Sequence, residues 1–285
     1  MFEGVDVASQ VYLNGAFLRL DEAQVSVLDR GFIFGDGVYE VVPVYAGKPF
    51  RMDEHLARLG RSLAALRIAS PLDDRQWRDL VTTLAKDATC SVYIQVTRGV
   101  ARRDHAFPKH PVEPTVFAMS TPFTPPGKGV REEGLTAIGI VDERWLHCEI
   151  KSISLLGNVL AKQEAVEAGV DEAIQFRDGW LTEGASTNIW VVIDDTLLAP
   201  PRSNLILEGI RYSLMLSLAE EQGIPVVMRP ISRAEVECAD ELMLTSASKE
   251  VLPVVRLDGQ NVGGGQPGPV YARLRKAYDE RIAAL

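Results

Sequence analysis

Lys151 is the residue with the clearest potential for covalent chemistry. It stands where a strand-like run, residues 145–151, gives way to a turn over 152–158. Small and apolar neighbours desolvate an amine in such a position, and desolvation disfavours the ammonium form. A neutral amine is the nucleophile that forms a Schiff base with an aldehyde. Most lysines at strand ends are structural or solvated, so this interpretation depends on partner residues elsewhere in the chain.

An aldehyde cofactor such as pyridoxal phosphate also needs a carboxylate beside its ring nitrogen and donors for its phosphate. Glu183 is our candidate carboxylate, because the small residues 184–186 after it let a flat ring approach the backbone. Arg58 offers a forked, permanently charged phosphate donor, and His55 lies one helical turn earlier on the same face. Taken singly, these residues could equally be an exposed turn carboxylate and solvated surface charges.

Two further segments offer anion donors. Gly209-Ile210-Arg211 opens a predicted helix, whose first N–H groups could face a phosphate. Residues 245–248, Thr-Ser-Ala-Ser, end a predicted strand and supply hydroxyls and amides. The string Gly-Asp-Gly-Val-Tyr-Glu over 35–40 is a turn into a strand that presents Tyr39. It is not a dinucleotide fingerprint, because that motif must open a helix.

The composition is that of an ordinary globular protein, with 285 residues, 46% hydrophobic and 24% charged. A net charge of -9 argues against binding nucleic acid through phosphates. The three cysteines form no C-x-x-C, so we expect buried free thiols in a reducing cytosol. Residues 1–6 lack the layout of a signal peptide, and no apolar run is long enough for a membrane span. We therefore expect a cytoplasmic protein.

The hydrophobic periodicity and the positions of proline and glycine predict a mixed α/β protein of two domains. Prolines and glycines over 121–129 interrupt the chain, so we place an N-terminal α/β domain at 1–120, a linker at 121–133 and a C-terminal domain at 134–285. Strands are predicted at 38–45, 91–97, 135–141, 145–151, 172–177, 187–193, 225–229, 240–245 and 251–257. Helices are predicted from Asp53, and at 73–86, 158–168, 209–222 and 268–284.

The motifs taken together resemble the fold-type IV pyridoxal-phosphate aminotransferases, and within them the bacterial D-amino-acid aminotransferases. The resemblance is densest at residues 29–40, 53–59, 95–99, 151–158 and 182–188. It implies a smaller N-terminal α/β domain, a larger C-terminal α/β pseudo-barrel that binds pyridoxal 5'-phosphate, and a homodimer. Amino acids and 2-oxo acids would be its partners, with no role for nucleic acid or membrane.

The resemblance also assigns cofactor contacts. Lys151 would form the Schiff base, Glu183 would contact the pyridine nitrogen and Arg58 would bind the phosphate. The other implied cofactor contacts are the backbone amides of Ile210 and Arg211, together with Thr187, Ser246 and Ala247. Relatives usually carry Thr where this chain has Arg211, so the hydroxyl at that position is missing. Arg211 either replaces it or points away.

Substrate handedness would follow from a carboxylate trap. In D-specific members of the family, an Arg-x-His pair from the partner subunit acts with the Tyr of the 35–40 string, which here means Arg103, His105 and Tyr39. The implied reaction is a ping-pong transamination between a D-amino acid such as D-alanine and a 2-oxo acid such as 2-oxoglutarate. The alternatives are a branched-chain L-amino-acid aminotransferase, a lyase resembling aminodeoxychorismate lyase, and a catalytically silent binding protein.

Overall fold

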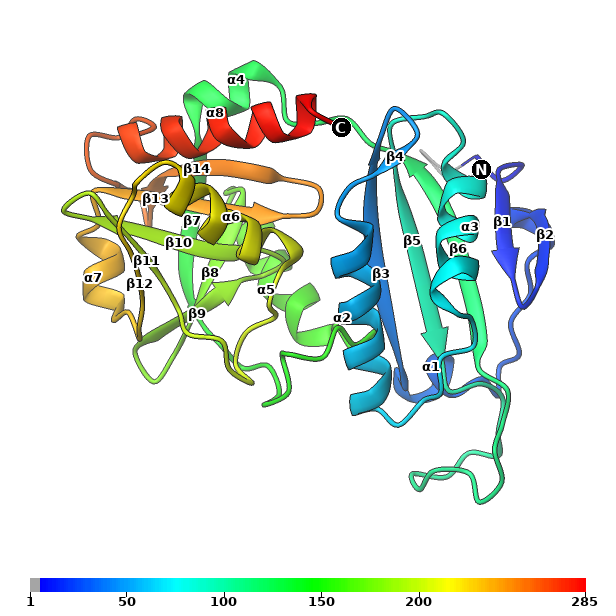
Figure 1. Ribbon diagram of the computed structural model, residues 1–285. Coiled ribbons are helices and arrows are strands. Elements are labelled where there is room, and N and C mark those ends of the chain that lie inside the picture. Colours follow the sequence, from blue (N-terminus) through cyan, green and yellow to red (C-terminus); the bar gives the residue numbers. More distant parts are fainter. Residues whose placement is uncertain (1–5) are drawn as a thin grey trace. The chain divides into compact units, whose positions relative to one another are not determined.

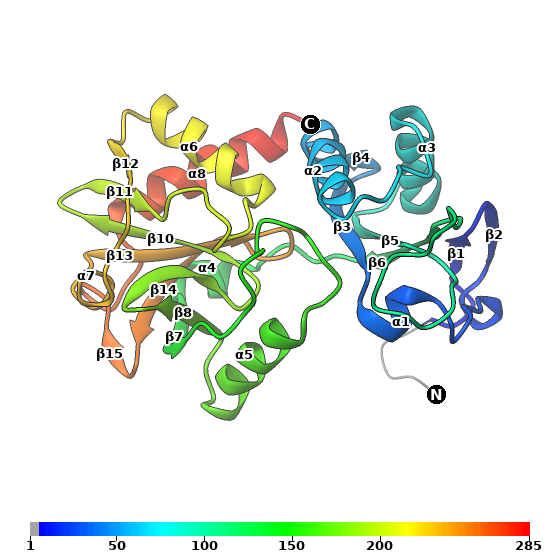
Figure 2. The same cartoon turned by 90° about the horizontal axis from the view of Figure 1, so that it is seen from below.

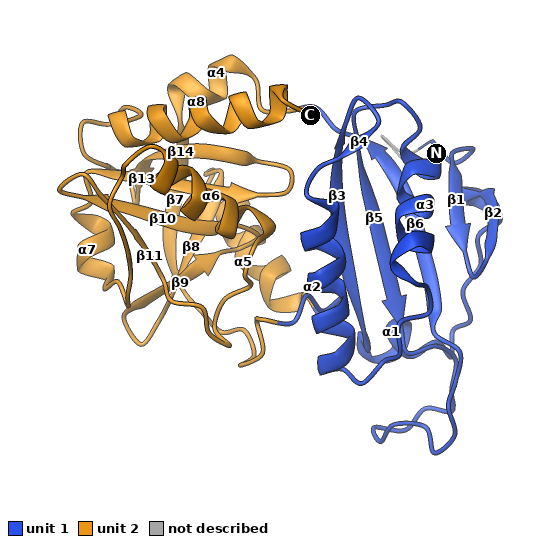
Figure 3. Ribbon diagram, in the orientation of Figure 1, with its two compact units in different colours: residues 1–124, 150–154 blue, residues 125–149, 155–285 orange. Residues whose placement is uncertain are grey.

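The computed structural model describes residues 6–285 and divides the chain into two compact units (Figures 1 and 3). The first unit comprises the chain up to Thr124 together with Ile150–Ser154, and the second comprises Pro125–Glu149 and Leu155–Leu285. This division differs from the single boundary predicted at 121–133, because a short central segment returns to the first unit. The absence of a signal peptide was inferred from residues 1–6, and most of that segment lies outside the described residues.

The first unit is built on a six-stranded antiparallel sheet in the order β2-β1-β6-β5-β3-β4 (Figure 1). Its strands are β1 (Gln10–Leu13), β2 (Ala16–Arg19), β3 (Gly37–Tyr45), β4 (Lys48–Pro49), β5 (Cys90–Thr97) and β6 (Thr115–Pro122). Its helices are α1 (Arg30–Phe34), α2 (Met52–Ala65) and α3 (Asp74–Ala85), with a 3-10 turn at Leu20–Glu22.

Helices α2 and α3 cover one face of this sheet (Figure 2). The helix predicted from Asp53 is confirmed as α2, and its leucines at 3-4 spacing, Leu56, Leu59 and Leu63, are buried with the inward residues of β3 and β5. The predicted start of α3 is also confirmed, because Asp73 caps it in a capping box. The start expected at Asp53 is off by one residue: α2 begins at Met52, after Arg51 in a left-handed conformation, so Asp53 does not cap the helix.

The predicted strand over 145–151 is wrong, because this stretch is irregular. Its end instead lies along the edge of β3, where the Tyr39 amide donates to the Lys151 carbonyl at 2.9 Å and the Ile153 amide to the Gly37 carbonyl at 3.1 Å. β4 pairs with Val44 and Tyr45 at the end of β3, so the edge of the first half of β3 is left for this segment, which forms a bridge from Ser152 to Val38. An open strand edge binds extended backbone.

The second unit is built on a nine-stranded mixed sheet in the order β12-β11-β10-β13-β14-β7-β8-β9, with β15 paired to β14. The strands are β7 (Leu135–Val141), β8 (Glu172–Arg177), β9 (Trp180–Gly184), β10 (Asn188–Ile193), β11 (Thr196–Ala199), β12 (Val226–Met228), β13 (Glu241–Ser246), β14 (Glu250–Leu257) and β15 (Gln260–Asn261). The helices are α4 (Lys128–Glu133), α5 (Leu156–Glu167), α6 (Ile210–Glu221), α7 (Arg233–Glu237) and α8 (Pro269–Ala283).

This sheet curls back on itself, because β9 at its end connects through a tight turn to β10 near its other end. The Gly184 amide donates to the Thr187 carbonyl at 2.7 Å across that turn. Helices α6 and α8 pack on β13, whereas α5 packs on β7 and β8. The curled sheet with its covering helices confirms the predicted mixed α/β class.

Within residues 6–285, no helix has the length and apolar character that a membrane crossing requires. The same residues contain no cluster of His, Cys, Asp and Glu suited to a metal ion. All three cysteines are free, as predicted, and Cys90 and Cys148 are buried. Cys238 is exposed, so the prediction of burial is wrong there, because it follows the short surface helix α7.

Candidate active site

Lys151 is fixed through its backbone, while its amine remains available at the end of a flexible chain. Its amide donates to the Ser62 hydroxyl of α2 at 3.1 Å, and its carbonyl accepts from Tyr39. The side chain is partly buried, and Nζ lies 4.0 Å from the centroid of the Tyr39 ring. The structure therefore brings together two residues that the sequence singled out separately.

Arg58 is buried and held in a fixed orientation by Glu40 of β3. Its Nε lies 2.7 Å from Glu40 Oε1 and its Nη2 2.8 Å from Oε2, a two-point pairing. His55 Nδ1 lies 2.7 Å from Glu40 Oε2, so the predicted support of Arg58 by His55 runs through this carboxylate. Burial alone would raise the pKa of Glu40, but Arg58 and His55 outweigh it and hold that pKa well below its usual range.

Arg103 and His105 lie together in the loop over 98–114, which joins β5 to β6. Both side chains are exposed, and both approach the Phe34 ring of α1. The His105 ring centroid and the Arg103 guanidinium carbon each lie 5.5 Å from the centroid of that ring. Within residues 6–285 of one chain, neither makes a hydrogen bond or ring contact with Tyr39, so this chain alone does not assemble the predicted trap.

Glu183 lies at the end of β9 and is buried, with 6% of its surface exposed. Its Oε1 accepts from Arg144, and its Oε2 accepts from the Leu207 amide at 2.9 Å. Burial raises the pKa of the Glu183 carboxyl, and Arg144 only partly opposes that effect. Arg144 is shared with Asp142, whose oxygens lie 3.0 Å from its Nε and 2.8 Å from its Nη2.

Asn188 connects Glu183 to the start of α6. Its Nδ2 donates to Glu183 at 3.3 Å, and its Oδ1 accepts from the Gly209 amide at 3.2 Å. A Cβ at position 209 would lie 2.2 Å from Asn188 Oδ1, so this close approach requires glycine. Gly209 precedes α6 without a side-chain cap, which leaves the amide of Ile210 at a helix N-terminus suited to an anion.

The side chain of Arg211 points to another helix. It is buried, and its Nε donates to the Tyr278 hydroxyl of α8 at 3.0 Å. The alternatives left open by the sequence are thereby resolved: the guanidinium serves the packing of α6 on α8. The backbone amide is what this residue can offer to a phosphate.

The register of β10 on β13 places Ser246 and Ala247 near the start of α6. Asn188 pairs with Thr245, so the turn after Thr245 lies at the same sheet edge as Gly209. The Ser246 hydroxyl accepts from the Lys249 amide at 3.0 Å. Thr187, predicted as a cofactor contact, is buried and directs its hydroxyl to Glu172 at 3.2 Å.

The chemistry of the residues present fits pyridoxal phosphate. Within the first unit lie the amine of Lys151 and the guanidinium of Arg58, and within the second lie a buried carboxylate, helix-terminal amides and a hydroxyl. The sequence reasoning gave no role to Glu40, Arg144 or Asn188. Glu40 lies in the motif at 35–40 and Asn188 in the motif at 182–188. A polar side chain within an apolar strand was the signal that could have identified each of them. Arg144 lies in an irregular stretch that offers no such signal.

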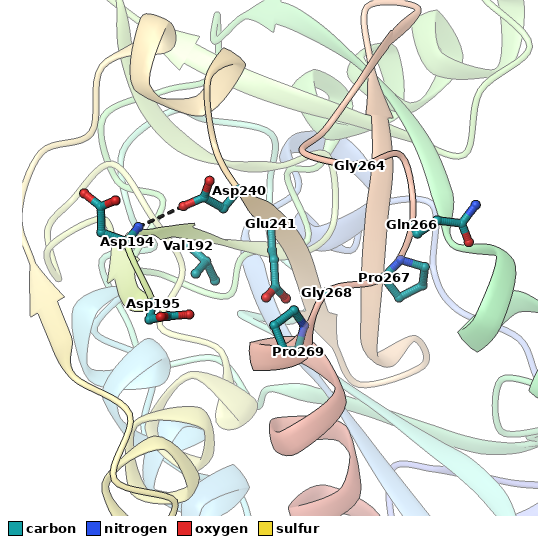
Figure 4. Close-up of a pocket in the computed structure, with 10 residues that line it drawn as sticks. All are labelled: Val192, Asp194, Asp195, Asp240, Glu241, Gly264, Gln266, Pro267, Gly268 and Pro269. Atoms are coloured by element: carbon teal, nitrogen blue, oxygen red, sulfur yellow. Dashed lines mark hydrogen bonds between the residues drawn. The ribbon is translucent and has the colours of Figure 1, made fainter.

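The second unit also contains a cavity of about 470 Å³, lined by acidic residues (Figure 4). Glu241 there accepts from the amides of Val270 and Tyr271, both at 2.8 Å, and so caps α8. Asp240 accepts from the Asp194 amide at 2.8 Å and holds the turn after β10. None of the predicted site residues lines this cavity, and two of its four carboxylates, those of Asp240 and Glu241, have structural partners.

Comparison with known proteins gives a consistent result. The model of the family described as amino-transferase class IV matches residues 37–257. The D-alanine aminotransferase of Staphylococcus haemolyticus is 39% identical over 277 residues, which cover 96% of this chain and 98% of that protein. That of Bacillus licheniformis is 39% identical over 276 residues, covering 96% and 97%.

Among solved structures, a branched-chain amino acid aminotransferase from T.th., bound to pyridoxamine 5'-phosphate, superimposes with a TM-score of 0.90. It is 27% identical, and the match covers 97% of this chain and 95% of that one. A fold IV transaminase from Curtobacterium pusillum matches with a TM-score of 0.81 at 24% identity, covering 94% and 92%. The predicted resemblance and the predicted fold are therefore confirmed.

Proposed function

The chain belongs to the amino-transferase class IV family, and from that premise we propose that it transfers the amino group between a D-amino acid, such as D-alanine, and a 2-oxo acid, such as 2-oxoglutarate. Pyridoxal 5'-phosphate is the cofactor of this family, and the residues here fit it. The observation that carries the proposal is the amine of Lys151 above Tyr39, in a chain that also holds the buried carboxylate of Glu183. The D-alanine aminotransferases among its relatives support the substrate class.

Each binding residue has a separate task. Bound pyridoxal phosphate supplies an aldehyde for the amino group and a cationic ring that withdraws electrons from the substrate Cα. Glu183 holds a proton at the ring nitrogen, and Arg144 and Asn188 fix the direction of its carboxylate. Arg58, the amide of Ile210, Ser246 and Ala247 would bind the phosphate. The pairing with Glu40 orients the Arg58 guanidinium before the phosphate arrives.

Lys151 moves the proton. With the cofactor bound, its amine would take the proton from Cα and return it to C4′, so that a single group would act in turn as base and acid. The backbone bonds on both sides of Lys151 fix its Cα, and only the side chain has to swing between the two atoms. The ring of Tyr39 limits that swing on one side.

The replacement Lys151→Ala tests the proposal. We expect turnover to fall by about 10³-fold or more, since the base and the covalent anchor are both lost. The visible absorbance of the reconstituted enzyme should be lost with it. Lys162→Ala is the matched control, because Lys162 is a partly exposed lysine of α5 whose amine donates to the Asp171 carbonyl. A Lys151→Ala enzyme that keeps both turnover and absorbance would refute the assignment.

Handedness follows from the side on which the carboxylate is held, because Lys151 acts on one face of the ring. With Arg103 and His105 as the trap, a panel of amino acids should show turnover of D-alanine and not of its mirror image. Turnover restricted to L-leucine, L-valine and L-isoleucine would favour a branched-chain aminotransferase, a function supported by the solved relatives. Release of ammonia or pyruvate without an acceptor would indicate a lyase.

A homodimer is part of the proposal, since the resemblance implies that the trap comes from a partner subunit. The segment before α1 exposes Val25, Val27 and Leu28, and α1 itself exposes Phe32. An isolated bridge at the adjacent Asp29 joins this segment to the similarly exposed Val100, in the loop that carries the trap. Light scattering should give twice the chain mass. The free thiols are consistent with the cytoplasmic location that we also propose.

A further inference from the structure

We propose that Arg30 is a positioning residue for substrate binding, which acts by holding the loop that carries Arg103 and His105. The inference deepens the proposed function and rests on the role given there to this pair. Arg30 takes no part in the chemistry itself. Its contact is with the backbone of the loop, between the two side chains that are to bind the substrate carboxylate.

The loop over 98–114 needs an anchor. It is long, it contains no helix or named strand, and its base is closed by the pairing of Thr97 with Thr115. Its two functional side chains are exposed and make no hydrogen bond among the described residues of their own chain. A long connection of this kind loses much conformational entropy when it adopts one shape, so fixed contacts must offset that loss.

Arg30 provides such a contact from inside the protein. It is only 3% exposed, and its Nη1 donates to the Asp104 carbonyl at 2.6 Å. Asp104 lies between Arg103 and His105, so the hydrogen bond fixes the peptide that joins the pair. The same Nη1 lies 3.4 Å from the Ala106 carbonyl, on the far side of His105. A single guanidinium nitrogen thus holds both sides of His105.

Asp36 anchors the guanidinium in turn. Its Oδ2 accepts from Arg30 Nε at 2.7 Å and from Arg98 Nε at 2.8 Å. The guanidinium carbon of Arg98 lies 3.7 Å from the centroid of the Phe107 ring, so this second arginine holds the loop at another point. Burial opposes the charge on Asp36, but both arginines outweigh it and lower the pKa of the carboxyl. The anchor therefore stays ionised at neutral pH.

Phe34 completes the arrangement as a platform for the loop. The guanidinium carbon of Arg30 lies 4.8 Å from its ring centroid, and Arg103 and His105 approach the same ring. A lysine at position 30 could keep the charge and one hydrogen bond. It could not serve Asp36 and the Asp104 carbonyl with the fixed fork of an arginine. Arg30→Lys is therefore the informative change.

The experiment uses the enzyme reconstituted with pyridoxal phosphate and four variants: Arg30→Lys, Arg103→Ala, the double variant, and Arg102→Ala as a control. Arg102 is an exposed arginine of the same loop, and it is not among the partners of Arg30 in the hydrogen bonds described above. We expect Arg30→Lys to raise KM for both D-alanine and 2-oxoglutarate about tenfold, with kcat within about twofold, because one charge-assisted hydrogen bond is lost. A general loss of folded enzyme would lower kcat and leave KM unchanged.

The double variant shows whether Arg30 acts through the pair. In the Arg103→Ala background, Arg30→Lys should produce little further rise in KM, because the group that it positions is already gone. If Arg103→Ala raises KM and Arg30→Lys does not, the inference about Arg30 is wrong while the proposed function stands. If Arg103→Ala leaves KM unchanged, the proposed trap is wrong.

Limited trypsin digestion gives an answer that does not depend on turnover. Arg102 and Arg103 are cleavage sites within the loop, and Lys128 of α4 is an exposed site in the other unit. Arg30→Lys should accelerate cleavage at Arg102 and Arg103 relative to the wild type and leave cleavage at Lys128 unchanged. Equal rates at the loop sites in both proteins would overturn the inference.

Discussion

Glu40 and Glu183 are both buried carboxylates that accept hydrogen bonds from an arginine, yet their pKa values move in opposite directions. Glu40 has Arg58 at two points and His55 as well. These positive partners outweigh burial. The carboxylate is therefore ionised, and its role is to orient the phosphate-binding guanidinium.

Glu183 shares its arginine with another carboxylate. Arg144 binds Asp142 through two nitrogens and reaches Glu183 through the third, and the charge of Asp142 further disfavours a second anion nearby. Burial therefore prevails over the attraction of Arg144. A buried carboxylate that shares its arginine with another carboxylate is only partly compensated, so a further positive group beside it can still favour its ionised form. A protonated ring nitrogen is such a group.

The largest effect should come from Glu183→Gln. We expect turnover to fall by about 10³-fold, because an amide cannot keep the ring nitrogen protonated as a carboxylate does. The fold should persist, since Arg144 keeps both hydrogen bonds to Asp142. Steady-state kinetics together with circular dichroism would check this. Turnover close to that of the wild type would contradict the role proposed for Glu183 at the ring nitrogen.

Glu40→Gln should act on stability. The change removes the negative charge that pairs with the buried Arg58 guanidinium, and breaking a buried ion pair costs about 3 kcal/mol of unfolding free energy. Urea unfolding of the cofactor-free protein measures the loss, and Glu183→Gln serves as the contrasting variant. An unfolding free energy within about 1 kcal/mol of the wild type would show that the Glu40 pair contributes little.

Glu40 and Glu183 should also make the stability depend on pH in opposite directions. The pKa of Glu40 is lowered by folding, so its contribution is present above the unfolded pKa, about 4.3, and is lost as pH falls through the folded pKa. The pKa of Glu183 is raised, so its contribution is present below that value and is lost as pH rises through the folded pKa.

The expected curves for the cofactor-free proteins follow. Between about pH 5 and pH 3, Glu40→Gln should lose less stability on acidification than the wild type. Above about pH 5, Glu183→Gln should lose less stability than the wild type as pH rises. These changes of unfolding free energy with pH should be smaller than the effects of Glu183→Gln on turnover and of Glu40→Gln on stability. Urea titrations at a series of pH values would measure them. Parallel curves for all three proteins would contradict the opposite shifts.

The sequence allowed much of the fold to be predicted where periodicity and caps were strong. The stripe of α2 and the capping box of α3 are local signals, and both elements form as expected. The strand expected over 145–151 does not form: Trp145 and Leu146 are exposed, and Ile150 packs on the core of the first unit. A pattern of residue types cannot reveal which sheet edge a segment joins.

The site residues were likewise predictable only where they lie within a local motif. Lys151, Glu183 and Arg58 stand within recognisable motifs, so their selection required no structure. Arg144 could not be selected, because its importance comes from a hydrogen bond to Glu183, 39 positions along the chain. The destination of the Arg211 guanidinium was likewise undetermined until α8 placed Tyr278 beside it.

The short stretch Ile150–Ser154 has a consequence for any attempt to take this protein apart. Because it is encoded inside one unit and completes a strand edge of the other, cutting the gene once after residue 124 yields neither unit whole. The shorter fragment would expose an unpaired edge that promotes aggregation. The longer one would keep the reactive amine without the backbone bonds that hold it, so recombination between relatives must exchange two separate stretches of the gene together.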